Sequence, residues 1–182
     1  MHQEVIMAGT GGQGIMVIGQ LLAYGAVGED KNVVWFPSYG PETRGGTADC
    51  TVIVSDDQIG SPVTAVPDTL LAMSQIQIGR HASKIKKDGV IFFNSTLVDD
   101  PSKERQDCKF VGVPASAIAD ELGNMRVANM VMLGAFIEIT KSVNLDSVCQ
   151  ALTKVLPSHR QDLIPLNEAA LRKGAEFAAK LK

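Results

Sequence analysis

The sequence VIMAGTGGQGIMVIG, residues 5–19, determines how this chain begins to fold. Its first four residues are apolar, which predicts a short buried strand. The next six, GTGGQG, are rich in glycine and predict a tight turn. Apolar residues follow at once, so a helix is expected to start directly after the turn. A strand, a glycine-rich turn and a helix in this order form the context in which a phosphate-binding loop works.

The glycine-rich turn is the first candidate binding site. Gly9 and Gly11 permit backbone angles and close contacts that a Cβ atom would block, and Gly14 lets the helix pack closely on the strand. The free N–H groups and the positive dipole end of the helix are expected to face an anion. Alternatively, the glycines only build a tight connection between strand and helix. The candidate residues are Gly9, Thr10, Gly11, Gly12, Gln13 and Gly14.

The rest of the chain alternates between predicted strands and helices. Apolar runs bounded by turn residues predict strands at residues 33–36, 51–55, 90–93 and 109–113. Helices are predicted at residues 14–27, 68–87, 115–122, 127–140, 145–156 and 165–180. This pattern is typical of an α/β protein, so we expect one Rossmann-like domain over residues 1–182, with a mostly parallel sheet and a helical C-terminal part.

Two of the predicted helices are apolar on nearly all sides, at residues 15–23 and 127–137. Such helices must be covered on several sides. One interpretation is an extensive subunit interface, which would also allow a homodimer of the isolated chain. The other is that each is a central helix packed inside the domain.

Composition excludes several classes of function. Of the 182 residues, 45% are hydrophobic and 20% are charged, and the net charge of −3 gives no electrostatic basis for binding nucleic acid. No apolar stretch has the length of a membrane span, and the N-terminus lacks the features of a signal peptide, so a cytoplasmic protein is expected. The cysteines at positions 50, 108 and 149 are too far apart in sequence to form a metal-binding motif.

The residues after the turn do not favour a nicotinamide cofactor. In the NAD-binding form of this loop, an acidic residue about 20 positions further on, at the end of the second strand, binds the ribose hydroxyls. Here the second strand ends in VVWFPS, residues 33–38, without an acid. No Gly-Lys-Ser/Thr follows the glycines, so a Walker-type loop is excluded as well. The turn is therefore expected to hold a phosphate without selecting NAD.

A second loop, between the second and third predicted strands, is the most distinctive part of the sequence. Prolines stiffen it, glycines shape it, and Arg44 offers a planar donor group suited to phosphate or carboxylate. We interpret it as a recognition surface; alternatively, Glu42 and Arg44 pair with each other or with solvent. The candidate residues are Tyr39, Gly40, Pro41, Glu42, Arg44, Gly45 and Gly46.

Together these motifs resemble the gamma subunit of 2-oxoacid:ferredoxin oxidoreductases, most closely the 2-oxoglutarate type. The motifs that carry the resemblance are GTGGQG at residues 9–14, PSYGPETRGGT at 37–47, VIVSD at 52–56 and IGSP at 59–62. The resemblance extends over nearly the whole chain. The combination of both loops at this spacing is specific, whereas the glycine pattern alone is weak.

The resemblance implies a complex that converts 2-oxoglutarate, coenzyme A and oxidised ferredoxin into succinyl-CoA, CO2 and reduced ferredoxin. In that family, thiamine diphosphate with magnesium binds to the alpha and beta subunits, and iron–sulfur clusters to the beta and often a delta subunit. The two loops of this chain are then candidate coenzyme A or interface elements, with Arg44 as the phosphate partner.

The sequence contains no evident catalytic set. Its three histidines, at positions 2, 81 and 159, lack the spacing of metal ligands or of a triad, and no nucleophile is paired with a base. The isolated chain is therefore expected to be inactive. The alternatives are a stand-alone nucleotide-binding or NAD-dependent Rossmann protein, and a purely structural subunit whose turn binds nothing.

Overall fold

A computed structural model describes residues 1–39, 46–103 and 105–181 of the chain. Within these residues it has six strands: β1 (His2–Thr10), β2 (Asn32–Tyr39), β3 (Thr47–Ser55), β4 (Thr69–Ala72), β5 (Val90–Asn94) and β6 (Lys109–Val113). The α-helices of the same residues are α1 (Ile15–Val27), α2 (Gln75–His81), α3 (Ala115–Glu121), α4 (Ala128–Thr140), α5 (Leu145–Val155) and α6 (Ile164–Ala179). Short 3-10 helices are η1 (Ala82–Lys84), η2 (Pro101–Lys103), η3 (Met125–Val127) and η4 (Ser158–Leu163).

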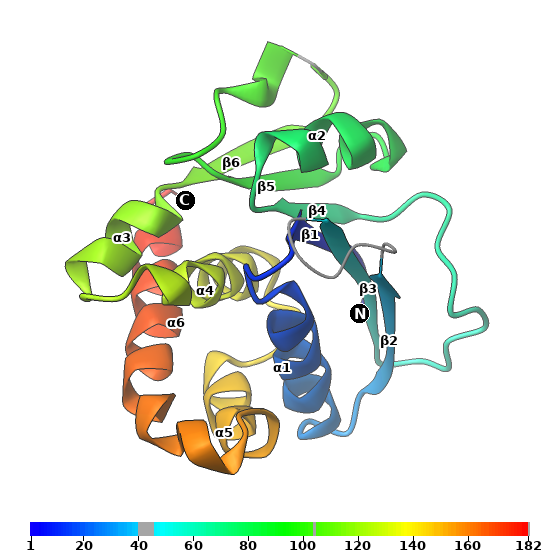
Figure 1. Ribbon diagram of the computed structural model, residues 1–182. Coiled ribbons are helices and arrows are strands. Elements are labelled where there is room, and N and C mark those ends of the chain that lie inside the picture. Colours follow the sequence, from blue (N-terminus) through cyan, green and yellow to red (C-terminus); the bar gives the residue numbers. More distant parts are fainter. Residues whose placement is uncertain (40–45, 104, 182) are drawn as a thin grey trace.

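The strands form a single sheet in the order β2-β3-β1-β4-β5-β6. Strands β1, β4, β5 and β6 are parallel neighbours, while β3 runs antiparallel to both β1 and β2. The predicted single α/β domain with a mostly parallel sheet and a helical C-terminal part is therefore confirmed. Figure 1 shows the C-terminal helices α4, α5 and α6 gathered with α1, away from α2.

One predicted element was wrong. Residues 68–87 were expected to form a helix, but they contain β4, then α2 and η1. The four residues of β4 are all buried, and they pair in parallel with β1 and β5. A short apolar run that is buried on both faces has no alternating pattern, so its local sequence does not distinguish a strand from a helix.

The sheet separates two apolar layers, because successive residues of a strand point to opposite faces. On β1, Val5 and Met7 face the layer that contains α1, α4, α5 and α6. Ile6 and Ala8 face a smaller layer with Ile78 of α2. The two layers are unequal, and only the larger one is thick enough to cover a helix on all sides.

Helix α4 is the central helix of the larger layer. Its residues 128–137 are all buried inside the chain, which confirms the interpretation as a packed core helix and leaves that segment no surface for an interface. Close packing against α6 is possible because Gly134 lies against the backbone of Leu171, and Gly174 lies against the backbone of Val131. Helix α1 is buried along one side and exposes Tyr24 on the other.

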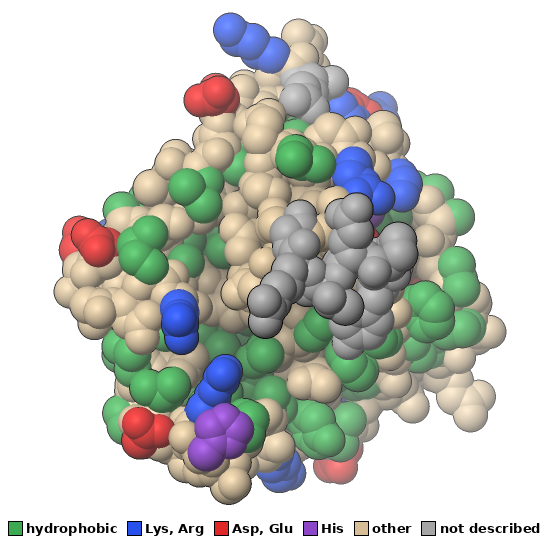
Figure 2. Space-filling view, viewed as in Figure 1, with side chains coloured by type: hydrophobic (Ala, Val, Ile, Leu, Met, Phe, Trp, Pro, Cys, Tyr) green, Lys and Arg blue, Asp and Glu red, His purple; other side chains and the backbone are tan. Residues whose placement is uncertain are grey.

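The surface of the described residues is mixed in character. On the face seen in Figure 2, hydrophobic, basic and acidic side chains are interspersed, in keeping with the small net charge. Among the described residues, none of the helices has both the length and the apolar character that crossing a membrane requires.

Candidate functional site

The glycine-rich turn joins the end of β1 to the start of α1, as the sequence predicts. Gly12 has φ 96° and Gly14 has φ 71°, backbone conformations that favour glycine. Gly14 is the residue before the first helical residue, so the first N–H groups of α1 point out of the turn without an intrahelical acceptor. The backbone is therefore shaped to meet an anion at the positive end of the helix dipole.

Amide side chains hold this turn in place. Gln13 accepts a hydrogen bond at Oε1 from the Thr10 N–H (2.7 Å), and Gln77 of α2 donates from Nε2 to the Gly9 carbonyl (2.8 Å). Asn129, in the first turn of α4, donates from Nδ2 to the Gly14 carbonyl (3.1 Å). The turn is therefore anchored to two other helices, α2 and α4.

The second loop begins and ends at the same edge of the sheet as the glycine turn. Tyr39 is the last residue of β2, and its backbone pairs in register with Ala48 of β3. Gly46 is buried, and its carbonyl accepts a hydrogen bond from the Gly11 N–H (2.8 Å), so the turn and the end of the loop are in direct contact. The remaining predicted loop residues lie outside the described residues and stay predictions: Gly40, Pro41, Glu42, Arg44 and Gly45.

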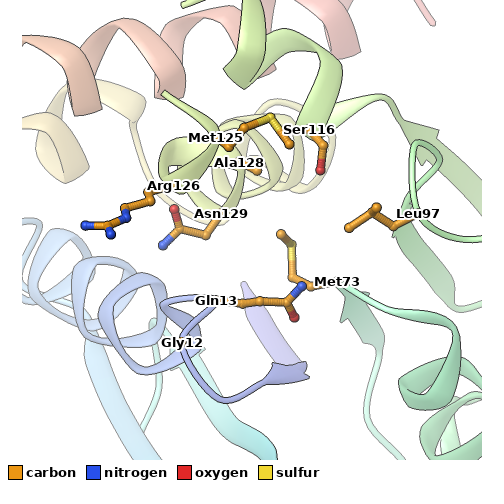
Figure 3. Close-up of a pocket in the computed structure, with 9 residues that line it drawn as sticks. All are labelled: Gly12, Gln13, Met73, Leu97, Ser116, Met125, Arg126, Ala128 and Asn129. Carbon is orange, nitrogen blue, oxygen red and sulfur yellow. The ribbon is translucent and has the colours of Figure 1, made fainter. Parts of the chain in front are cut away.

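A cavity of about 240 Å³ opens beside the turn. Figure 3 shows that its walls come from the turn, from the segments after β4 and β5, from η3, and from the starts of α3 and α4. Three flexible apolar side chains line it, from Met73, Leu97 and Met125. Its full lining is Gly12, Gln13, Met73, Leu97, Ser116, Met125, Arg126, Ala128 and Asn129.

A second cavity of about 220 Å³ adjoins the first. Both are lined by Gly12, Arg126 and Asn129, so they form one groove that crosses the glycine turn. The second part is more basic, because Arg160 of η4 lines it together with Arg126. Neither arginine forms an ion pair within the described part of the chain, and both are exposed. Two guanidinium groups are thus free to bind phosphate or carboxylate.

Sequence reasoning missed Arg126 and Arg160. Arg126 carried a recognisable signal, because it lies in the short helix η3 that leads into α4, where the helix dipole disfavours a cation. A basic residue at that position indicates a role other than helix stability. Arg160 carried no such signal, since only the packing of the C-terminal helices brings it to the turn.

The sheet order is a second observation that does not favour a nicotinamide cofactor. In a dinucleotide-binding sheet the second strand lies beside the first, and the acid at its tip reaches the ribose. Here β3 lies between β1 and β2, and it runs in the opposite direction. The end of β2 is therefore not the position from which an acid would reach a ribose at the glycine turn.

The described residues contain no group of three or more His, Cys, Asp or Glu side chains that could hold a metal ion. All three cysteines are free thiols. Burial raises the pKa of Cys50 to about 12 and that of Cys149 to about 11, so neither is a thiolate near neutral pH.

Fold and groove together define an α/β domain with a mostly parallel sheet and a groove that crosses the glycine-rich turn after β1. Residues 4–177 match the family model described as pyruvate ferredoxin/flavodoxin oxidoreductase. The chain belongs to this family.

Relatives place the chain more closely within the family. It is 34% identical to the 2-oxoglutarate synthase subunit KorC of Methanocaldococcus jannaschii, over 100% of this chain and 96% of that protein. It is 35% identical to the ketoisovalerate oxidoreductase subunit VorA of Methanothermobacter marburgensis over 97% of this chain, but spans only 37% of that protein's length. The crystal structure of a keto/oxoacid ferredoxin oxidoreductase gamma subunit from Geobacter sulfurreducens superposes with a TM-score of 0.83 at 27% identity, covering 99% of this chain and 98% of that chain.

Proposed function

We propose that this chain is the gamma subunit of a thiamine-dependent 2-oxoacid:ferredoxin oxidoreductase, and that its groove binds coenzyme A. The reaction is the oxidative decarboxylation of a 2-oxoacid to an acyl-CoA with ferredoxin as electron acceptor. The partners are the alpha and beta subunits, with a delta subunit where one is present, and ferredoxin acts on the whole complex. Unpaired cysteines suit the reducing cytoplasm, where we place this complex.

The observation that supports coenzyme A is the two-part groove that crosses the glycine turn. Coenzyme A has a phosphorylated nucleotide at one end and a long, flexible thiol arm at the other. The part lined by Arg126 and Arg160 suits the phosphates, which would also meet the N–H groups at the start of α1. The part lined by Met73, Leu97 and Met125 suits the less polar arm, because methionine adapts to irregular ligands.

The role of this chain in the reaction is then to hold and orient coenzyme A. When bound on the partner subunits, thiamine diphosphate with magnesium supplies carbanion chemistry, and iron–sulfur clusters supply electron transfer. Holding the acyl acceptor in a fixed position lowers the entropic cost of its reaction with a partner-bound intermediate.

We propose 2-oxoglutarate as the 2-oxoacid. In its favour is the end-to-end match with a 2-oxoglutarate synthase subunit, in contrast to the partial span of the ketoisovalerate relative. The assembled complex should therefore turn over 2-oxoglutarate with a higher kcat/KM than 2-oxoisovalerate or pyruvate. A higher kcat/KM for either of the other two acids would reject 2-oxoglutarate as the substrate, but it would leave the family assignment unchanged.

The test of coenzyme A binding is the variant Arg126→Ala in the assembled complex. A lost charge-assisted contact to phosphate costs about 1.5–3 kcal/mol, and because Arg126 is exposed we expect the lower end, about a tenfold rise in the KM for coenzyme A. The KM for the 2-oxoacid should stay constant. A matched control is Arg172→Ala, because Arg172 is paired with Glu168 and Asp146 away from the groove.

Two results would reject this assignment. An unchanged KM for coenzyme A in Arg126→Ala and in Arg44→Ala would favour a purely structural subunit. Tight binding of NAD(H) by the isolated chain would favour the stand-alone alternative, so titrations with NAD(H), NADP(H) and coenzyme A belong in the same experiment.

A further inference from the structure

A third cavity, of about 210 Å³, lies on the opposite face of the sheet from α1 and α4. Its floor is made by outward-facing residues of β1, β2 and β3, its roof by the loop before β4, and one wall by α2 and η1. The lining residues from the strands include Ser38, Asp49 and Thr51. Ser38 and Asp49 are cross-strand partners, which places their side chains next to each other on this face.

Three ionisable side chains line this cavity without satisfying one another. His81 is only 5% exposed, and both of its ring nitrogens are buried without a hydrogen-bond partner among the described residues. Asp49 is half-buried and Lys84 is exposed, and neither forms a hydrogen bond or ion pair that the structure shows within the described residues. Buried polar groups in folded proteins are nearly always paired, so an unpaired imidazole beside a cavity indicates a missing partner.

The charges of the wall indicate the chemistry of that partner. Burial lowers the pKa of His81, although the carboxylate of Asp49 opposes this effect, so the imidazole is neutral near neutral pH. The cavity then carries one negative group, Asp49, and one positive group, Lys84. A neutral imidazole adds one hydrogen-bond donor and one acceptor. A cation or an anion alone would satisfy only one of the two charges.

The size of the cavity suits a small molecule. A volume of 210 Å³ corresponds to about seven water molecules at about 30 Å³ each. Apolar side chains also line the cavity, from Pro62, Val63 and Pro67. The space suits a compact molecule with a short side chain.

We propose that this cavity binds a small zwitterion of the α-amino-acid class, whose ammonium group contacts Asp49 and whose carboxylate contacts Lys84. The site is separate from the coenzyme A groove, because the two share no lining residue and lie on opposite faces of the sheet. A ligand here would therefore bind whether or not coenzyme A is present.

The experiment is a thermal-shift and calorimetric titration of the full-length chain with glycine, L-alanine, L-serine and L-glutamate. Propionate and ethylamine serve as probes that carry only one of the two charges. We expect saturable stabilisation by at least one amino acid and none by the single-charge probes. Failure of every amino acid to bind, or equal binding of propionate or ethylamine, overturns the proposal.

Variants identify the site. Asp49→Asn and Lys84→Met should each weaken binding about tenfold or more, since each removes a charge-assisted contact. Lys84 is exposed, so its replacement leaves the fold intact even if Asp49→Asn does not. Lys87→Met is the matched control, being exposed and outside the cavity. Arg126→Ala should bind the amino acid normally, which separates this proposal from the coenzyme A assignment. Undiminished binding of the amino acid by Lys84→Met would overturn the proposal.

Discussion

Replacing Gly134 by alanine should destabilise the protein through the crossing of α4 and α6. A Cβ atom on Gly134 would lie 2.8 Å from the carbonyl carbon and 3.1 Å from the Cα of Leu171, and closer still to its oxygen. These are backbone atoms, so no change of rotamer relieves the contact. Overpacking typically lowers the free energy of unfolding by about 1–3 kcal/mol, and the contact with backbone atoms here places the cost at about 3 kcal/mol or more. Alanine is about 1 kcal/mol more favourable than glycine inside a helix, which offsets part of this cost. The net expectation is a loss of about 2 kcal/mol in the free energy of unfolding.

Urea unfolding followed by circular dichroism measures this loss, which corresponds to a fall in Tm of about 4–8 °C for a chain of this length. Gly79→Ala is the control, because Gly79 lies within helix α2 and a Cβ atom there meets nothing within 4 Å. That variant should gain about 0.5–1 kcal/mol from helix propensity alone. If Gly134→Ala proves as stable as the natural chain while Gly79→Ala gains stability, the close crossing of the two helices is refuted.

Further predictions concern the turn, the thiols and pH. Gly14→Ala should cost about 1–2 kcal/mol, because Gly14 has φ 71°, and thermal unfolding would show it; an unchanged Tm contradicts that conformation. A thiol reagent should modify the half-buried Cys108 well before Cys50 or Cys149, because burial protects the other two thiols. Cys108→Ser should remove the fast phase of thiol modification. Burial lowers the pKa of His81, so the unfolded chain binds the proton more readily than the folded chain. The free energy of unfolding should therefore fall as the pH drops below about 6.5. His81→Phe should weaken this pH dependence, and an unaltered pH profile of stability in that variant would contradict the prediction.

Local features of the fold followed from the sequence. The glycine-rich turn and the helix after it were predicted at nearly their observed positions, and the strands predicted at residues 33–36, 51–55, 90–93 and 109–113 all lie within observed strands, although β2 and β3 are longer than predicted. Each of these signals acts over a few residues, through glycine conformations, turn residues and apolar periodicity. Strand β4 was missed because its neighbours β1 and β5, which make it a strand, are distant in the sequence.

The candidate site was predicted only in part. The turn at residues 9–14 joins the first strand to the first helix as predicted, and the structure adds its contact with Gly46 at the end of the second loop. The structure adds Arg126 and Arg160, which the chain brings to the turn from more than 100 positions away. No local sequence pattern predicts that these residues lie near the turn, because their position results from the packing of α4 and α6 on the sheet.

By itself, the sequence determined the local elements of this protein: the glycine-rich turn after the first strand, the helix that follows it, and most of the other strands and helices. The tertiary structure decided which strand lies beside β1, which helix anchors the turn, and which charged side chains share a cavity. The physical reason is that backbone conformation is set mainly by neighbouring residues. Strand order and cavities, in contrast, arise from hydrogen bonds and packing between residues far apart in the chain.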